Sequence, residues 1–146
     1  MKRHAFVYRF ALVVILLVTI TIAAQAFGIG VILGKPTGGL SFKTARNSTS
    51  AFDAALSWSL SAGRMLIHAD YLHHSPLAKN LPWYIGIGGV VGVGDNLYLG
   101  ARIPIGIVWV PPSAPIDVFL EVVPTIGLLP DVGFGAGFGL GIRYFL

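Results

Sequence analysis

Apolar residues alternate with glycine along the C-terminal segment Gly133–Leu146. Side chains of an extended strand point to opposite faces in turn, so one face of this segment carries only apolar residues: Phe134, Ala136, Phe138, Leu140, Ile142, Tyr144 and Leu146. The other face carries glycine and Arg143. A soluble strand would bury its apolar face and show polar side chains to water. This pattern instead predicts a strand whose apolar face meets continuous apolar surroundings and whose glycine face borders a narrow interior.

The chain from Phe27 onward divides into short alternating segments separated by turn residues. Eight strands are predicted: Phe27–Gly34, Leu40–Ala45, Phe52–Ser61, Arg64–Leu72, Trp83–Val93, Leu97–Trp109, Ile116–Leu128 and Val132–Leu146. No segment in this region shows a convincing helical period. The pattern predicts a single all-β domain over residues 27–146, an eight-stranded antiparallel up-and-down barrel.

The charged residues of this region avoid the apolar face. Some lie in or beside turns, and those within strands share the opposite face: Lys43, Asp53, Asp70, Arg102, Asp117, Glu121 and Arg143. A charge on the outside of a barrel at the bilayer midplane costs about 2–4 kcal/mol. The distribution therefore predicts a transmembrane barrel with its charges in the lumen, whereas a soluble lipocalin-like barrel would show the reverse.

The composition supports a membrane protein that crosses with strands. Of the 146 residues, 55% are hydrophobic and 11% are charged, against roughly 25% charged in soluble domains, and the mean hydropathy is +0.78. Beyond the N-terminus no apolar run approaches the ~18 residues of a membrane helix. The chain has no cysteine, which excludes disulfides, thiol nucleophiles and thiolate metal sites.

The first 26 residues have the pattern of a secretory signal peptide. Lys2, Arg3 and Arg9 precede and flank an apolar stretch over residues 10–24, and Ala24-Gln25-Ala26 fits a small-x-small cleavage site. Cleavage would remove three of the ten basic residues and no acid, leaving seven against six. This balance gives no reason to expect a nucleic-acid partner. An uncleaved membrane anchor is the alternative interpretation of the segment.

Outward-facing aromatic residues gather at the strand ends of one rim, the rim that holds both chain ends. They are Phe27, Phe52, Tyr71, Trp83, Trp109 and Tyr144. Such a girdle is typical of membrane barrels at the lipid–water interface. The other rim has mostly Leu, Val and Met, so the girdle is predicted to be one-sided.

Four stretches carry a resemblance to a known family: GIGVILGKPTG at Gly28–Gly38, AFDAALSWSL at Ala51–Leu60, HADYL at His68–Leu72 and GIRYF at Gly141–Phe145. With these the chain resembles a family of uncharacterised bacterial outer-membrane β-barrel proteins, and more broadly the small eight-stranded OmpA/OmpX-like barrels. The resemblance implies outer-membrane localisation, lipid as surroundings, insertion by the barrel-assembly machinery and a monomer. It implies no activity and no cofactor. The chain departs from these barrels in ending on Leu146 and in having tight turns at the presumed outer rim.

One cluster of residues could carry chemistry. A two-residue turn at Ala62-Gly63 would place Ser57 opposite His68, with Asp70 on the same face, and serine, histidine and a carboxylate are the elements of a hydrolytic site. These groups are predicted to point inward, away from lipid substrates, so a packed polar interior is the favoured interpretation. His73 and His74 beside His68 lack a completing carboxylate cluster and alternate between faces, so no metal site is predicted.

The predicted lumen contains charge pairs with glycines beside them. A turn at Gly94–Asn96 places Gly88 opposite Arg102 and Gly92 opposite Tyr98, and a turn at Leu129–Asp131 places Asp117 opposite Arg143. Arg102 could then reach Glu121 on the neighbouring strand. An eight-stranded barrel is just wide enough to be filled by side chains. The favoured function is therefore a structural or envelope role without catalysis, and the alternatives are a lipid-modifying hydrolase and a narrow channel.

Overall fold

A computed structural model of the protein describes residues 12–15, 27–35, 38–59 and 63–146. Residues 12–15 are helical. The remainder of residues 1–26, which are predicted to be a signal peptide, lies outside the described residues. The signal peptide therefore stays a prediction. Within the described segments, no helix is long and apolar enough to cross a membrane.

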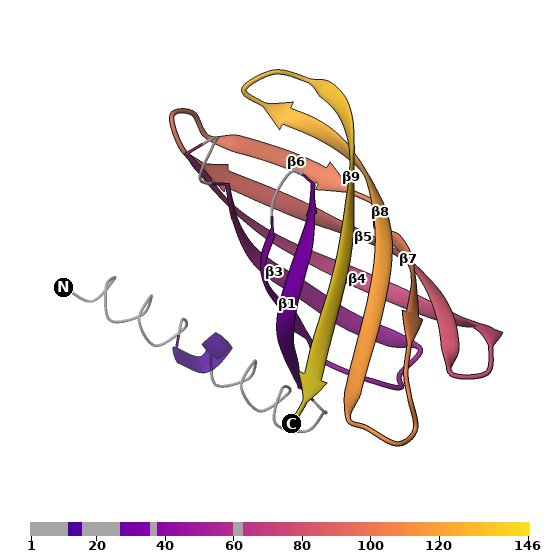
Figure 1. Ribbon diagram of the computed structural model, residues 1–146. Helices are drawn as coiled ribbons and strands as arrows, with labels where there is room; N and C mark the ends of the chain where they lie inside the picture. Colours follow the sequence, from indigo (N-terminus) through magenta and orange to yellow (C-terminus); the bar gives the residue numbers. More distant parts are fainter. Residues whose placement is uncertain (1–11, 16–26, 36–37, 60–62) are drawn as a thin grey trace.

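The described chain forms one antiparallel sheet of nine strands. In chain order these are β1 (Gly28–Lys35), β2 (Gly38–Lys43), β3 (Ser50–Ser59), β4 (Arg64–Ala78), β5 (Leu81–Val93), β6 (Tyr98–Arg102), β7 (Ile105–Trp109), β8 (Ile116–Leu129) and β9 (Gly133–Phe145). Figure 1 shows the sheet curling around, so that β1 and β9, from opposite ends of the described strands, lie side by side.

The prediction of eight strands is wrong by one, because Leu97–Trp109 forms two strands. β6 and β7 both lie between β5 and β8 and continue each other in space. They are interrupted at Ile103–Pro104, where proline has no N–H to donate to a neighbouring strand. The backbone carbonyl of Pro104 still accepts a hydrogen bond from the Gly86 N–H at 2.8 Å. The break therefore divides the strand without opening the sheet.

Each strand is paired on both of its edges. Consecutive strands pair along the chain, with β6 and β7 sharing the place between β5 and β8. The first strand pairs with the last over Gly28↔Phe145 to Lys35↔Phe138, and β4 pairs with β5 from Met65↔Val93 onward. We call the rim where β9 ends the C-terminal rim, and the rim where β9 begins the opposite rim.

The burial of side chains along each strand follows the alternation in the sequence. On β4 the buried side chains are Leu66, His68, Asp70, Leu72 and His74, and the exposed ones between them include Met65, Ile67 and Tyr71. Exposed large apolar residues occur on every strand, whereas the charged residues of the strands are mostly buried. The sheet thus has an apolar outer face and a polar inner face.

The end of β4 and the register of β3 against β4 differ from the sequence prediction. β4 continues to Ala78, through residues 73–78 that were predicted to be a loop, because it stays paired with β5 through Ser75↔Trp83 and Pro76↔Pro82. The register of β3 against β4 is also shifted by two residues from the predicted one: Ser59 lies opposite Arg64 and Ser57 opposite Leu66. The connection between these strands is therefore longer than the predicted two-residue turn at Ala62-Gly63.

Candidate functional site

The inner face near the C-terminal rim holds a group of ion pairs around Arg143, which we call the Arg143 cluster (Lys43, Asp53, Asp117 and Arg143). The Arg143 side chain is fully buried. Its Nε donates a hydrogen bond to Asp117 Oδ1 at 2.9 Å, and its Nη1 donates to Asp53 Oδ2. Lys43 Nζ lies 3.4 Å from Asp117 Oδ2. The two cations and two carboxylates neutralise one another, which is what burial of charge requires.

A glycine on the intervening strand β1 allows the Arg143 side chain to extend to residues of β2 and β3. Gly30 on β1 lies directly between Arg143 on β9 and Ser41 on β2. Because glycine has no side chain, the guanidinium can extend across β1, and its Nη1 lies 3.5 Å from Ser41 Oγ and bonds to Asp53 on β3. The guanidinium also lies over the Phe119 ring, 4.0 Å from its centroid. Residues from four strands, β2, β3, β8 and β9, are joined at this point.

A second group, the Arg102 cluster (Asp70, Arg102 and Glu121), lies farther toward the opposite rim. Arg102 Nε is 2.9 Å from Asp70 Oδ1, and Nη2 is 3.6 Å from Glu121 Oε1. Here too a glycine lies between the partners, since Gly88 on β5 is opposite both Asp70 on β4 and Arg102 on β6. The Tyr84 hydroxyl donates a hydrogen bond to Glu121 Oε2 at 2.7 Å.

His68 lies between the two clusters. Its Nε2 is 3.7 Å from both Asp53 Oδ1 and Asp70 Oδ2. The ligating atoms of these three side chains lie within 4.8 Å of one another, a spacing compact enough to hold a metal ion. One oxygen of each carboxylate is already engaged by an arginine, and those two positive charges disfavour a further cation. The arrangement is better described as a continuous ion-pair network than as a metal centre.

The alternative hydrolytic cluster of Ser57, His68 and Asp70, which the sequence disfavoured, is only partly brought together. Ser57 and His68 are not opposite each other, as predicted, because His68 lies opposite Ala55. The ring nitrogen Nε2 of His68 faces two carboxylates at equal distance. In a serine–histidine–carboxylate site, the nitrogen that faces the serine and the nitrogen that faces the carboxylate are different. The register correction therefore removes the pairing on which the hydrolase hypothesis rested.

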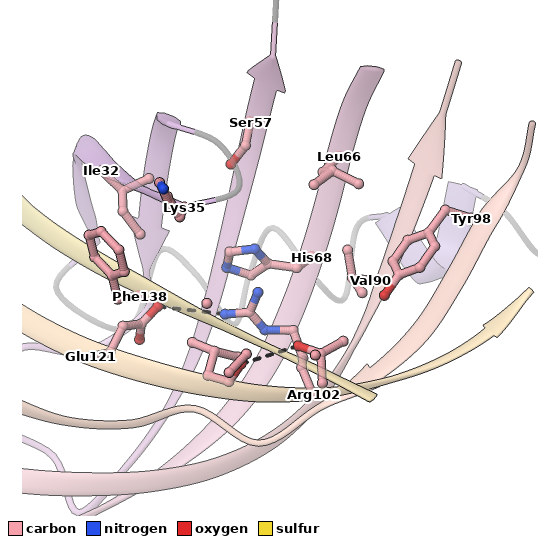
Figure 2. A pocket seen from close by; sticks show the side chains of 15 residues that line it. Ile32, Lys35, Ser57, Leu66, His68, Val90, Tyr98, Arg102, Glu121 and Phe138 are labelled. Atoms are coloured by element: carbon pink, nitrogen blue, oxygen red, sulfur yellow. Dashed lines mark hydrogen bonds and ion pairs between the residues drawn. The ribbon is translucent and has the colours of Figure 1, made fainter. Parts of the chain in front are cut away.

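A cavity of about 370 Å³ lies above the Arg102 cluster, toward the opposite rim. Figure 2 shows its wall, with the Arg102 guanidinium reaching toward Glu121. The lining combines apolar side chains with a few polar ones, and it includes Ile32, Leu66, Val90, Val123, Phe138, Lys35, Ser57, His68, Tyr98 and Thr125. The interior is thus filled around the Arg143 cluster and hollow above the Arg102 cluster. Mixed lining of this kind is typical of small-molecule sites.

The mouth of the interior at the C-terminal rim is crossed by Arg46. Its Nε donates to the Ile116 carbonyl at 3.2 Å, and its Nη2 donates to the carbonyls of Pro111 and Ala114. A shallower cavity of about 310 Å³ lies beside it, lined by Arg46, His74, Asn80 and neighbouring loop residues. Arg46 therefore ties two loops of this rim together.

The predicted aromatic girdle lies at the C-terminal rim. Phe52, Tyr71, Trp109 and Tyr144 are each more than 40% exposed, and Phe52 packs edge-to-face on Tyr71 with ring centroids 5.4 Å apart. Phe27 stacks on Phe42 at 6.1 Å; Phe27 and Trp83 are half-buried. The one-sided distribution is wrong, because exposed aromatic residues also lie toward the opposite rim: Trp58, Phe134 and Phe138.

Several interior residues were missed by the sequence reasoning. Tyr84 is 1% exposed and His74 is 9% exposed, and His74 Nε2 lies 3.1 Å from Lys43 Nζ. Both residues share the inward face of their strands with predicted lumen residues. The alternation along β4 places His74 on the inward face, but the sequence predicts a loop over residues 73–82 and so hides this position.

No protein-family model and no curated protein matches the chain. Among solved structures, the chain is similar to one described as "De novo design of transmembrane beta-barrels", with a TM-score of 0.53 and 13% identity. The match covers 83% of this chain and 95% of that chain. This likeness shows that the protein has a β-barrel fold.

Proposed function

We propose that the protein is a small integral β-barrel of the bacterial outer membrane, exported by a cleaved signal peptide over residues 1–26, with a structural role in the envelope and no catalysis. The single observation that carries the proposal is the reversal of polarity across the sheet. Every strand has at least one exposed large apolar side chain on the outer face, while the inner face buries the ion pairs. Exposed apolar surface of this extent indicates contact with a membrane.

The strand lengths and the pairing pattern suit a membrane-spanning barrel. β4, β5, β8 and β9 have 13 to 15 residues each, and a tilted strand needs about 9–11 to cross a bilayer. Backbone polar groups cannot be left unpaired in hydrocarbon, so a spanning sheet must close on itself. The β1–β9 and β4–β5 pairings support such a closure. The designed protein with a similar fold is itself described as transmembrane.

A structural role fits the interior better than conduction or hydrolysis does. The Arg143 cluster and the Arg46 contacts occupy the interior at the C-terminal rim, which opposes a continuous water path for ions. Asp70, one of the three residues considered for a hydrolytic site, is paired with Arg102, and His68 lies opposite Ala55 rather than Ser57. We propose that the barrel is monomeric, is inserted by the barrel-assembly machinery and has lipid as its principal partner.

A charge placed on the outer face tests the membrane assignment. Leu140 is 51% exposed and lies on β9 between Tyr144 at one rim and Phe134 at the other, so we expect Leu140→Arg to reduce stability in lipid vesicles by about 2–4 kcal/mol. Val132→Arg, at a residue that precedes β9 and is 75% exposed, is the control, with an expected cost of about 0–1 kcal/mol near the interface. The measurement is urea unfolding followed by tryptophan fluorescence.

Two outcomes would contradict the proposal. One is an equal cost for both arginine variants, because a soluble protein has no depth-dependent penalty. The other is a monomer that stays in solution without detergent. A folded membrane barrel should also migrate differently on a gel before and after heating.

A further inference from the structure

We propose that the cavity of about 310 Å³ at the C-terminal rim binds the phosphate group of a small organic phosphate, with His74 and Arg46 as its principal donors. Soluble phosphate esters and lipid head groups share this chemistry, and the experiment has one arm for each source. The inference goes beyond the structural role proposed for the barrel, and it does not rest on that role, because the lining of the cavity carries it.

One buried polar atom on the wall of this cavity has no partner. His74 is 9% exposed, and its Nε2 lies 3.1 Å from Lys43 Nζ. An ammonium group only donates hydrogen bonds, so Nε2 is the acceptor and the ring proton is on Nδ1. Nδ1 is buried and makes no hydrogen bond to any described residue. Because a buried donor without an acceptor is costly, this N–H indicates that the cavity receives an acceptor from outside the chain.

The charge beside this cavity favours an anion over water as that acceptor. Arg46 lines the cavity, and no acidic residue is among the described residues that line it. The hydrogen bonds of Arg46 go from Nε and Nη2 to backbone carbonyls, which leaves Nη1 for a ligand. The adjacent Arg143 cluster has two cations and two carboxylates, so it does not cancel the charge of Arg46. The cavity above the Arg102 cluster differs, because Glu121 lines it.

Neutral polar side chains surround the same space. They belong to the β2–β3 loop, the end of β4 and the β4–β5 turn: Asn47, Ser48, Thr49, Ser75 and Asn80. The Thr49 carbonyl accepts a hydrogen bond from the backbone N–H of His74 at 2.7 Å, which holds the β2–β3 loop beside β4. Donors on several elements suit a phosphate group, since its three acceptor oxygens point in different directions.

The size and position of the cavity suit a small ester that enters from the rim. Its volume of about 310 Å³ lies at the lower end of the range of roughly 300–1,000 Å³ for small-molecule sites, so a small organic group fits beside the phosphate. Val110 and three prolines complete the lining, and they offer this group an apolar wall. Asn47, Ser48 and Thr49 are exposed, so the ligand reaches the cavity without any strand edge opening.

The test uses the full chain in detergent with isotope-labelled histidine, so that nuclear magnetic resonance observes the His74 Nδ1–H proton directly. The soluble probe is glycerol phosphate, and the lipid probe is the short-chain phospholipid dihexanoylphosphatidylglycerol. We expect the proton to move downfield with the probe that supplies the phosphate, because a charged acceptor strengthens the hydrogen bond. Glycerol is the uncharged control and should leave the signal unchanged. An unchanged signal with both phosphates would overturn the inference and leave water as the acceptor.

His74→Phe removes the donor and keeps a ring against Tyr84, whose centroid lies 5.4 Å from that of His74. It should weaken phosphate binding by about ten-fold or more, as expected for loss of a hydrogen bond to a charged group. The matched control is His73→Phe, because His73 is exposed on the outward face and does not line the cavity. Its affinity should equal that of the wild-type protein. Equal affinities for His74→Phe and His73→Phe would contradict the proposed site.

Arg46→Gln keeps the proposal testable if His74→Phe does not fold. It removes the positive charge, so phosphate binding should weaken and lose most of its dependence on salt concentration. Unchanged binding in this variant would also overturn the inference. All of these measurements are made on the barrel in detergent, so their failure leaves the membrane assignment intact, which depends on the comparison of Leu140→Arg with Val132→Arg.

Discussion

In both charge clusters of the barrel interior an arginine extends across a glycine to a carboxylate, but only one of the two clusters is fully enclosed. In the Arg143 cluster, an arginine reaches across Gly30 to a partner beyond it, and in the Arg102 cluster, an arginine reaches across Gly88 to Asp70. The first cluster is enclosed, with the side chains of Lys43, Asp117 and Arg143 fully buried. The second borders a cavity, and the Arg102 side chain keeps 10% of its surface exposed.

The residues on the inward face of β9 explain this difference. Toward the C-terminal rim that face carries Arg143 and Phe145, both buried. Toward the opposite rim it carries only glycine, at residues 133, 135, 137, 139 and 141. Other strands also carry glycine on their inward faces, among them Gly30 and Gly34 on β1 and Gly88 and Gly92 on β5, but none has an unbroken run of five as β9 does. The comparison teaches that the side-chain volume along β9 contributes to which part of this barrel is filled and which part is hollow.

Arg143→Ala should have the largest effect among the variants that test this comparison. It leaves the carboxylates of Asp53 and Asp117 without their guanidinium in an enclosed region, and breaking a buried ion pair typically costs about 3–5 kcal/mol. Adding Asp117→Ala should recover part of the loss, because one of the two carboxylates left without a guanidinium is then removed. The recovery should be incomplete, since Asp117 also pairs with Lys43. The free energy of unfolding in detergent, measured for the double-mutant cycle, gives the coupling.

Arg64→Ala serves as the control for loss of an arginine. Arg64 is exposed and lies 5.6 Å from the Tyr98 ring centroid, so its removal should cost about 1 kcal/mol or less. Strictly additive losses for Arg143→Ala and Asp117→Ala would show that the two residues do not interact.

Arg102→Ala should cost less than Arg143→Ala, about 2–3 kcal/mol, a range typical of hydrogen bonds to charged groups. The cavity of about 370 Å³ allows water to reach Asp70 and Glu121 when the guanidinium is removed, whereas neither this cavity nor the one of about 310 Å³ at the C-terminal rim is lined by a residue of the Arg143 cluster. The same unfolding experiment provides the measurement. A loss as large as that of Arg143→Ala would mean that both ends exclude water equally, and the distinction between a filled and a hollow end would be wrong.

The sequence was sufficient to predict the inward face and much of the register. The turns at Gly94–Asn96 and Leu129–Asp131 predicted Gly88 opposite Arg102 and Asp117 opposite Arg143, and both pairings are confirmed. The sequence also predicted that Arg102 could reach Glu121, and the structure places the two 3.6 Å apart. These predictions succeed because a one-residue shift would move every charge to the apolar face.

Other features could not be derived from the same pattern. A shift of two residues keeps every side chain on its face, so the alternation did not distinguish the predicted register of β3 and β4 from the observed one. Pro104 was placed inside a continuous strand because its neighbours alternate correctly. The cavity is lined by residues of several strands, so its presence depends on how their inward side chains meet rather than on any single segment.

The smallest effect, and the most direct comparison of the two ends, comes from adding one methyl group to β9. At Gly141, a Cβ would overlap with Cζ of the buried Phe119 ring, which is itself covered by Arg143. Gly141→Ala should therefore destabilise the barrel by about 1–2 kcal/mol, within the usual cost of overpacking. At Gly135, a Cβ would meet nothing within 4 Å, so Gly135→Ala should change stability by less than about 0.5 kcal/mol. The two variants share a strand, a face and a chemical change, so any difference in their unfolding free energies reports local packing. Equal effects would mean that β9 glycines matter for strand conformation alone and that side-chain volume does not separate the filled end from the hollow one.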